Sequence, residues 1–227
     1  MGFLKSLRQN LRERFLTRNS PQDIFSKYAQ SNKWGDKDSL SGKGSNLETT
    51  SELRQKLPEL LKELGATSLV DVPCGDFFWM AQVDLGEIEY LGGDIVPSLI
   101  AANQQKHRRK GRRFEVVDLI TGPVPKGDVL FVRDCLVHLS NEHVTQALTN
   151  IANSGSTWLL STTFPQISEN QDIMTGQWRA LDLTKPPFNL PTPKNFIVEG
   201  NGHLQGQTSD KMLGLWPVSA LAAFKAP

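Results

Sequence analysis

Between residues 65 and 163, short apolar runs alternate with segments of helical periodicity. The apolar runs cover residues 68–71, 88–94, 113–118, 128–133 and 157–163. Helical spacing of apolar positions fits residues 77–83, 97–107 and 141–153. Buried strands that alternate with helices are typical of a parallel sheet covered on both faces, joined by right-handed crossovers. This part of the chain is therefore predicted to form an α/β core.

The segments on either side of this core carry other patterns. Apolar residues recur at helical spacing over residues 2–18, a shorter helical pattern spans residues 22–34, and another helix is expected over residues 48–64. A polar loop rich in glycine and serine, residues 35–46, lies between the last two. The chain is proline-rich and irregular from residue 164 to 194, and two further strands are expected within residues 195–200 and 211–224.

Charge is unevenly distributed, although the net charge is only +1. Residues 1–18 hold five basic residues and one acid, for +4, and residues 106–113 hold six basic residues and no acid, for +6. The remainder carries −9. The chain is therefore an acidic globule with two basic segments, and the first of these is a basic amphipathic helix over residues 1–20.

Composition excludes several classes of protein. Two cysteines exclude a disulfide-rich scaffold and a four-cysteine zinc site, and no metal-ligand cluster is visible. No run approaches 18 apolar residues, and basic residues interrupt the apolar positions at the N-terminus, so neither a membrane span nor a signal peptide is expected. We expect a cytoplasmic protein. Residues 2–18 could pack on the domain, on a partner protein or on an anionic membrane surface.

Acidic residues follow four consecutive apolar runs, at Asp71, Asp94, Asp118 and Asp134. A carboxylate at a strand end must be hydrated, paired or bound to a ligand. Ligands of open parallel sheets bind outside the carboxyl ends of the strands, near the point where the strand order reverses. These positions therefore predict a ligand site, and Gly75, just after the first run, would let backbone approach the ligand closely.

The same residues carry a resemblance to a known family. The turn from Asp71 to Gly75, the acid Asp94 nineteen residues after Gly75, Asp118, and the segment DVLFVRDCLVHL at 128–139 resemble the motifs of class I S-adenosylmethionine-dependent methyltransferases. Pro73 and Phe77 stand where that family usually has glycine. The stretch VDVPCGDFFWM, with an upstream SGKGS loop and a downstream WR…PPFNLP segment, also resembles an uncharacterised branch of these enzymes.

The resemblance implies a Rossmann-like α/β fold. This is a three-layer sandwich around a mostly parallel seven-stranded sheet, with the last strand antiparallel. Residues 21–227 would form the domain, with a cofactor-binding core over 65–164 and an acceptor-side insert over 165–195. The residues expected to contact S-adenosylmethionine are Asp71, Pro73, Cys74, Gly75, Asp94, Ile95, Asp118, Leu119 and Arg133. A helix that begins near Asp76 would point free amide groups at the methionine carboxylate.

The acceptor side is expected beyond the fourth strand. Asp134 and His138 are the predicted catalytic residues, since histidine has the pKa of a general base near neutral pH; a histidine packed on the sheet is the alternative. Trp178 and Arg179 are predicted to bind the acceptor, with Arg179 as a clamp for a phosphate or carboxylate. The loop at 35–46 would be a lid or an ordinary surface loop.

The predicted function is methyl transfer from S-adenosylmethionine to a hydroxyl or amine of a small molecule, sugar or lipid-linked precursor. A small molecule or glycan is therefore the expected partner. Nucleic acid is disfavoured because no aromatic residues interleave the basic run at 106–113. Two alternatives stay open: a catalytically silent binding module with the same fold, and an NAD(P)-dependent oxidoreductase on a related fold.

Overall fold

A single seven-stranded sheet runs through the molecule. The structure, a computed structural model, describes residues 2–199 and 210–224, with the backbone alone for residues 2–8. The strands follow the order β3-β2-β1-β4-β5-β7-β6 across the sheet. Their bounds are β1 Ser68–Asp71, β2 Glu89–Asp94, β3 Arg112–Val116, β4 Val129–Val132, β5 Trp158–Thr163, β6 Asn195–Val198 and β7 Met212–Pro217.

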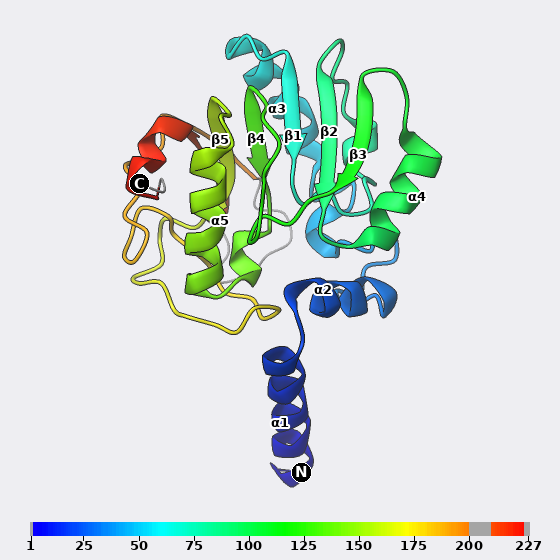
Figure 1. The fold of residues 1–227 in the computed structure, drawn as a ribbon, viewed down its shortest axis with the longest axis vertical. Helices are drawn as coiled ribbons and strands as arrows, with labels where there is room; N and C mark the ends of the chain where they lie inside the picture. Colours follow the sequence, from blue (N-terminus) through cyan, green and yellow to red (C-terminus); the bar gives the residue numbers. More distant parts are fainter. Residues whose placement is uncertain (1, 200–209, 225–227) are drawn as a thin grey trace.

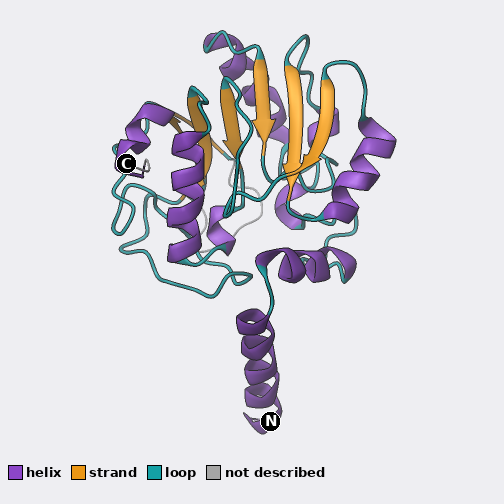
Figure 2. Ribbon diagram, viewed as in Figure 1, coloured by secondary structure: helices purple, strands orange, loops and turns teal. Residues whose placement is uncertain are grey.

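Strand directions confirm the predicted fold class. The strands β1 to β5 pair in parallel, whereas β7 runs antiparallel to both β5 and β6. The chain order reverses between β1 and β4, which are direct neighbours. The carboxyl ends of the parallel strands therefore share one edge of the sheet, and Figure 2 shows their arrowheads directed toward the N-terminal helices.

Helices cover both faces of the sheet (Figure 1). They are α1 Gly2–Arg18, α2 Pro21–Gln30, α3 Ser51–Glu63, α4 Pro97–His107 and α5 Asn141–Asn153, with short 3₁₀ helices at Lys43–Ser45, Met80–Gln82, Leu136–His138 and Val218–Phe224. Most lie where the apolar spacing predicts them. The α5 helix, for example, begins at the cap Ser140, whose hydroxyl accepts from the amide of His143.

Two expected elements differ from the structure. The helix predicted over residues 77–83 is reduced to the 3₁₀ turn at Met80–Gln82, because Phe77 adopts a φ of 58° that no α-helix accommodates. The strand predicted over residues 211–224 ends at Pro217, and the 3₁₀ helix Val218–Phe224 follows it.

The hydrophobic core has two halves, one on each face of the sheet. Neighbouring residues of β1 point to opposite faces, so Val70 packs in the half that contains α5 and Leu69 in the half that contains α3. The centres of β4 and β5 are buried almost completely. This buried sheet gives the strand ends a rigid support, and the side chains that follow the strands are positioned by it.

The N-terminal helix α1 projects from the end of the domain at which the parallel strands terminate (Figure 1). Its last turns contact the domain, where Leu16 packs against Ile24 and Tyr28 of α2. The Tyr28 hydroxyl in turn donates to the carbonyl of Gly176, at 2.9 Å. Leu11, further along α1, is 56% exposed. The apolar stripe of α1 is therefore covered near its carboxyl end and open at Leu11.

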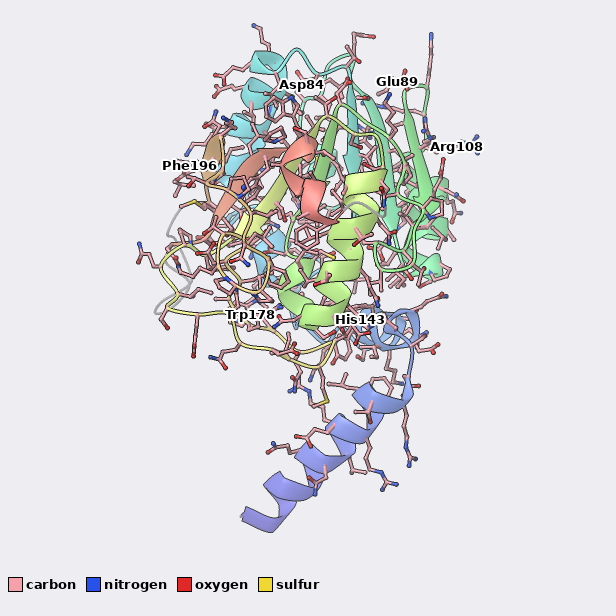
Figure 3. The ribbon with its side chains drawn as sticks, turned by 60° about the vertical axis from the view of Figure 1, so that its left-hand side comes forward. Asp84, Glu89, Arg108, His143, Trp178 and Phe196 are labelled. Atoms are coloured by element: carbon pink, nitrogen blue, oxygen red, sulfur yellow. The ribbon has the colours of Figure 1, made fainter. Side chains whose placement is uncertain are left out.

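The proline-rich segment, residues 164–194, contains no helix or strand, as its composition predicts. It nevertheless contributes to the core through Leu181, Leu183, Phe188 and Leu190. Trp178 lies on this segment, at the end of the molecule from which α1 projects (Figure 3). Of the helices described, none combines the length and the apolar character that crossing a membrane requires.

Candidate functional site

A cavity of about 1100 Å³, including its open mouth, lies at the carboxyl ends of β1, β2 and β4. The predicted cofactor-side and catalytic residues all line it: Asp71, Pro73, Cys74, Gly75, Asp94, Ile95, Asp118, Leu119, Arg133, Asp134 and His138. We call it the first cavity. Residues separated by up to 67 positions in the sequence meet there because their strands end at the same edge of the sheet.

The turn after β1 forms the floor of the first cavity. The Tyr90 hydroxyl donates to the Asp71 carboxylate at 2.6 Å, and burial raises the pKa of Asp71 to about 7. Gly75 has a φ of 55°, and a Cβ there would lie 2.1 Å from the Ser41 hydroxyl oxygen. Two turns of the chain therefore approach each other more closely than any side chain at position 75 would allow.

Phe77 follows the same turn in a conformation usually left to glycine. Its φ of 58° is left-handed, and its ring is fully buried against Tyr90, His107 and Phe114. Phe77 thus adopts the left-handed backbone conformation that glycine adopts most easily. Its ring is at the same time part of the hydrophobic core.

Asp94, at the end of β2, joins the first two strand ends. Its carboxylate accepts from the amide of Gly75 at 3.0 Å and from the amide of Val96 at 2.9 Å. Burial raises the pKa of Asp94 to about 6, although these two hydrogen bonds oppose the effect. Each carboxylate oxygen keeps a second lone pair, so Asp94 can also accept from the hydroxyl groups of a ligand.

Asp118, after β3, is held by its own turn. The carboxylate accepts from the amide of Ile120 at 2.8 Å and from the Thr121 hydroxyl at 2.7 Å. This fixes the turn that brings Leu119 to the first cavity. An adenine-sized ring would meet an apolar wall at Leu119 and Ile95, both of which line the cavity.

The loop at 35–46 packs against the first turn. The Asp76 carboxylate accepts from the Ser39 hydroxyl at 3.0 Å and from the amide of Leu40 at 2.7 Å. Ser39 and Ser45 are buried, and Leu40, Ser41 and Ser45 line the first cavity. Asp76 is thus an anchor for this loop, and the α-helix predicted to begin near it is absent.

Asp134, after β4, belongs to an ionic network that links β4, β6 and β7. The Lys211 ammonium lies 2.6 Å from the Asp134 carboxylate and 2.7 Å from that of Glu199. Arg133 pairs with Glu199 and lies 3.3 Å from Asp134. Burial opposes ionisation of Asp134, but the charges of Lys211 and Arg133 outweigh it and lower its pKa to about 2. Asp134 is therefore an anion at every physiological pH.

His138 ends the 3₁₀ turn after β4 and is held in one orientation. Its Nδ1 lies 2.8 Å from the carbonyl oxygen of Gln177, and its ring packs against Trp34 at a centroid distance of 5.8 Å. A carbonyl only accepts, so Nδ1 carries the proton and Nε2 keeps its lone pair in the neutral ring. Burial lowers the pKa of His138, which favours this neutral form.

A second cavity adjoins the first and shares Trp34, Ser41, Asp134 and His138 with it. Trp178 lines this second cavity. Arg179 lines neither cavity. Its guanidinium donates to the carbonyl of Leu136 at 2.7 Å and also to the Gln171 carbonyl and the Asn141 side chain. Arg179 is predicted from the sequence to clamp the acceptor, but in the structure its donors are used to hold these parts of the chain together.

Comparison with known proteins gives a likeness in structure. No family model and no curated protein sequence matches the chain. Among solved structures, the N-methyltransferase NodS from Bradyrhizobium japonicum WM9, in complex with S-adenosyl-L-homocysteine, superposes with a TM-score of 0.59 and 14% identity, over 84% of this chain and 97% of that one. The chain has a methyltransferase fold.

Two other methyltransferases support the same conclusion. The methyltransferase domain of bacterial CtHen1-C matches with a TM-score of 0.55 at 12% identity, over 76% of this chain and 98% of that one. Human N-acetylserotonin methyltransferase, in complex with S-adenosylmethionine, matches with a TM-score of 0.50 at 11% identity, over 83% of this chain and 61% of that one. At identities this low, the likeness to these methyltransferases shows a shared fold.

Several residues that line or adjoin the first cavity could not be assigned to it from the sequence pattern. Trp34 and Ser41 precede the first strand, Glu199 directly follows β6, and Lys211 directly precedes β7. Only the pairing of β6 with β7 brings Glu199 beside Lys211, with the Glu199 amide donating to the Lys211 carbonyl at 3.3 Å. The serine-glycine pattern of residues 35–46 marks the loop, but it does not indicate that Asp76 anchors it.

Proposed function

We propose that the protein transfers the methyl group of S-adenosylmethionine to a hydroxyl or amine of a small molecule, a sugar or a lipid-linked precursor. The observation that supports this most strongly is the first cavity. There the four acids that follow successive strands line one space, and His138 lines it as well. The likeness to methyltransferases with S-adenosylhomocysteine or S-adenosylmethionine bound agrees with it.

The residues of the first cavity suit this cofactor. The lining of the cavity combines apolar side chains with a few carboxylates, the combination that orients a nucleoside-sized ligand. Asp94 would hold the ribose hydroxyls, Asp118 the adenine amino group, and Asp71 would lie on the side of the methionine part. Gly75 lines the same cavity and lies too close to Ser41 for any side chain at position 75.

When bound, S-adenosylmethionine would supply an electrophilic methyl group to the oxygen or nitrogen of the acceptor and would leave as S-adenosylhomocysteine. The chain must hold the acceptor in line with that methyl group and remove a proton when the acceptor carries one. We assign Nε2 of His138 as the atom that takes up the acceptor's proton. The Nδ1 atom already donates to the Gln177 carbonyl, and burial lowers the pKa of His138 and so favours the neutral ring. The protonated ring then forms beside an anion.

That anion is Asp134, which we assign a positioning role. With its pKa lowered to about 2 by Lys211 and Arg133, it does not take up the proton itself. Its negative charge favours protonation of His138 and would stabilise the imidazolium that forms in the reaction. The two predicted catalytic residues therefore have different tasks, and His138 alone is the general base.

Release of S-adenosylhomocysteine tests the proposal. The protein is incubated with S-adenosylmethionine and with pools of hydroxyl- and amine-bearing metabolites, sugars and lipid-linked precursors, and product is quantified by mass spectrometry. We expect acceptor-dependent release with wild type and a strong loss with His138→Asn. His143→Asn is the matched control, because His143 lines neither cavity. No release above background with any pool would contradict the proposal.

A further inference from the structure

The two adjoining cavities differ in the sign of their charges. The described side chains that line the first cavity include five aspartates and one arginine: Asp71, Asp76, Asp94, Asp118, Asp134 and Arg133. Those that line the second include four basic residues and one acid: Arg12, Lys33, Lys43, Lys211 and Asp134. Three of these basic residues, Lys33, Lys43 and Lys211, lie outside the two basic segments, in the part of the chain that is strongly acidic.

Three of the four basic residues of the second cavity have charged groups without a partner in the described part of the chain. Lys211 is held by Asp134 and Glu199. The side chains of Arg12, Lys33 and Lys43, by contrast, have no ion pair or hydrogen bond with any described residue. They come from α1, from the turn after α2 and from the loop at 35–46. Like charges that the fold brings together without a counter-charge attract an anion.

The second cavity also has aromatic walls. Tyr28, Trp34, Phe164 and Trp178 line it, and Trp178 packs edge-on against Phe164 at a centroid distance of 6.1 Å. Trp178 is nevertheless 48% exposed, so much of its indole is free to contact a ligand. An indole face binds the apolar face of a ring or sugar, and its negative potential does not attract an anion. The lining therefore fits a molecule with both an apolar body and a negative charge.

We propose that the methyl acceptor is an anionic small molecule, with a phosphate or carboxylate group on a ring-shaped or apolar body. Arg12, Lys33 and Lys43 bind its negative group and Trp178 its body, while its hydroxyl or amine reaches His138 where the two cavities meet. This rests on the proposed function for the reaction, but binding of an anion in the second cavity can be tested without it.

Binding of three probes tests the inference. Calorimetry compares phenyl phosphate, benzoate and the neutral benzyl alcohol, with the protein alone and with S-adenosylhomocysteine in excess. We expect both anionic probes to bind at least about fivefold more tightly than benzyl alcohol, the effect of about 1 kcal/mol of ionic attraction. Raising the salt concentration should weaken the binding of the anionic probes only. Equal affinities for charged and neutral probes would overturn the proposal.

Charge reversal identifies the residues involved. The double variant Lys33→Glu/Lys43→Glu should bind phenyl phosphate at least about fivefold more weakly than wild type and should bind benzyl alcohol within about twofold of it. Lys37→Glu is the matched control, because Lys37 is exposed in the same loop and lines neither cavity. An equal loss in the control would show a general charge effect and would overturn the site.

Two further variants separate the parts of the site. Arg12→Glu should weaken phenyl phosphate binding, whereas Arg14→Glu, exposed on the same helix and outside both cavities, should not. Trp178→Ala should weaken phenyl phosphate but leave inorganic phosphate unchanged. If S-adenosylhomocysteine fails to bind while the anionic probes still do, the proposed function fails and the anion site stands. If S-adenosylhomocysteine binds and the anionic probes do not, the proposed methyl transfer stands and the proposal of an anionic acceptor fails.

Discussion

Asp94→Asn tests the assignment of the ribose-binding residue. The Asp94 carboxylate accepts from two backbone amides, at 3.0 Å from Gly75 and 2.9 Å from Val96, and Asp94 lines the first cavity. Asparagine keeps one oxygen and places an NH₂ group where the other accepted. A hydrogen bond to a charged group contributes about 1.5–3 kcal/mol. Loss of one such bond to the ribose should weaken S-adenosylhomocysteine binding about 10- to 150-fold.

The assay is calorimetry at several pH values. Since burial raises the pKa of Asp94 to about 6, the wild-type affinity should decline below about pH 6, as protonation removes an acceptor. The variant should lack that decline. Asp84→Asn is the matched control, because the Asp84 carboxylate also accepts from the amide two residues ahead, at 3.0 Å, at the opposite end of the molecule from Trp178 (Figure 3). Affinity of Asp94→Asn within about twofold of wild type, with the fold intact, would refute the assignment.

Three further predictions concern the same site. His138→Asn should lower the rate of methyl transfer about 10²- to 10⁴-fold and leave S-adenosylhomocysteine affinity unchanged, and an unaltered rate would make His138 structural. Lys211→Met leaves the Asp134 and Glu199 carboxylates without their shared cation and should lower the free energy of unfolding in urea by about 3–5 kcal/mol; a loss below about 1 kcal/mol would contradict this. Because the folded-state pKa of Asp71 is raised from 3.8 to about 7, its contribution to stability falls as pH rises from 4 to 7, by about 4 kcal/mol in all. Asp71→Asn should flatten that decline in urea unfolding, and an identical pH dependence in both proteins would count against it.

Much of the fold follows from local pattern. The strand over residues 68–71 and the helices over residues 97–107 and 141–153 lie where the apolar spacing predicts them. A strand that is buried on both faces is apolar at every position. A helix that is buried on one side has apolar residues that recur with the helical period. Even the prediction that acids after successive strands gather at one site holds in space, because parallel strands end at the same edge.

The parts that local pattern misses depend on tertiary contacts. Phe77 takes a left-handed conformation because its ring fills the core beside Tyr90 and Phe114, so the helix predicted there does not form. Arg179 has the chemistry of a phosphate clamp, but the carbonyl of Leu136 holds it inside the fold. Lys211 joins the site only through strand pairing at the far edge of the sheet.

Direct binding of S-adenosylhomocysteine is the measurement closest to the central claim. Calorimetry with the wild-type protein, run beside NAD, should give one site for S-adenosylhomocysteine with a dissociation constant between about 1 µM and 1 mM, and no heat with NAD. Affinity should drop in Asp94→Asn and stay unchanged in Asp84→Asn. Absence of S-adenosylhomocysteine binding, or tighter binding of NAD, would contradict the assignment of this cavity to a methyl-transfer cofactor.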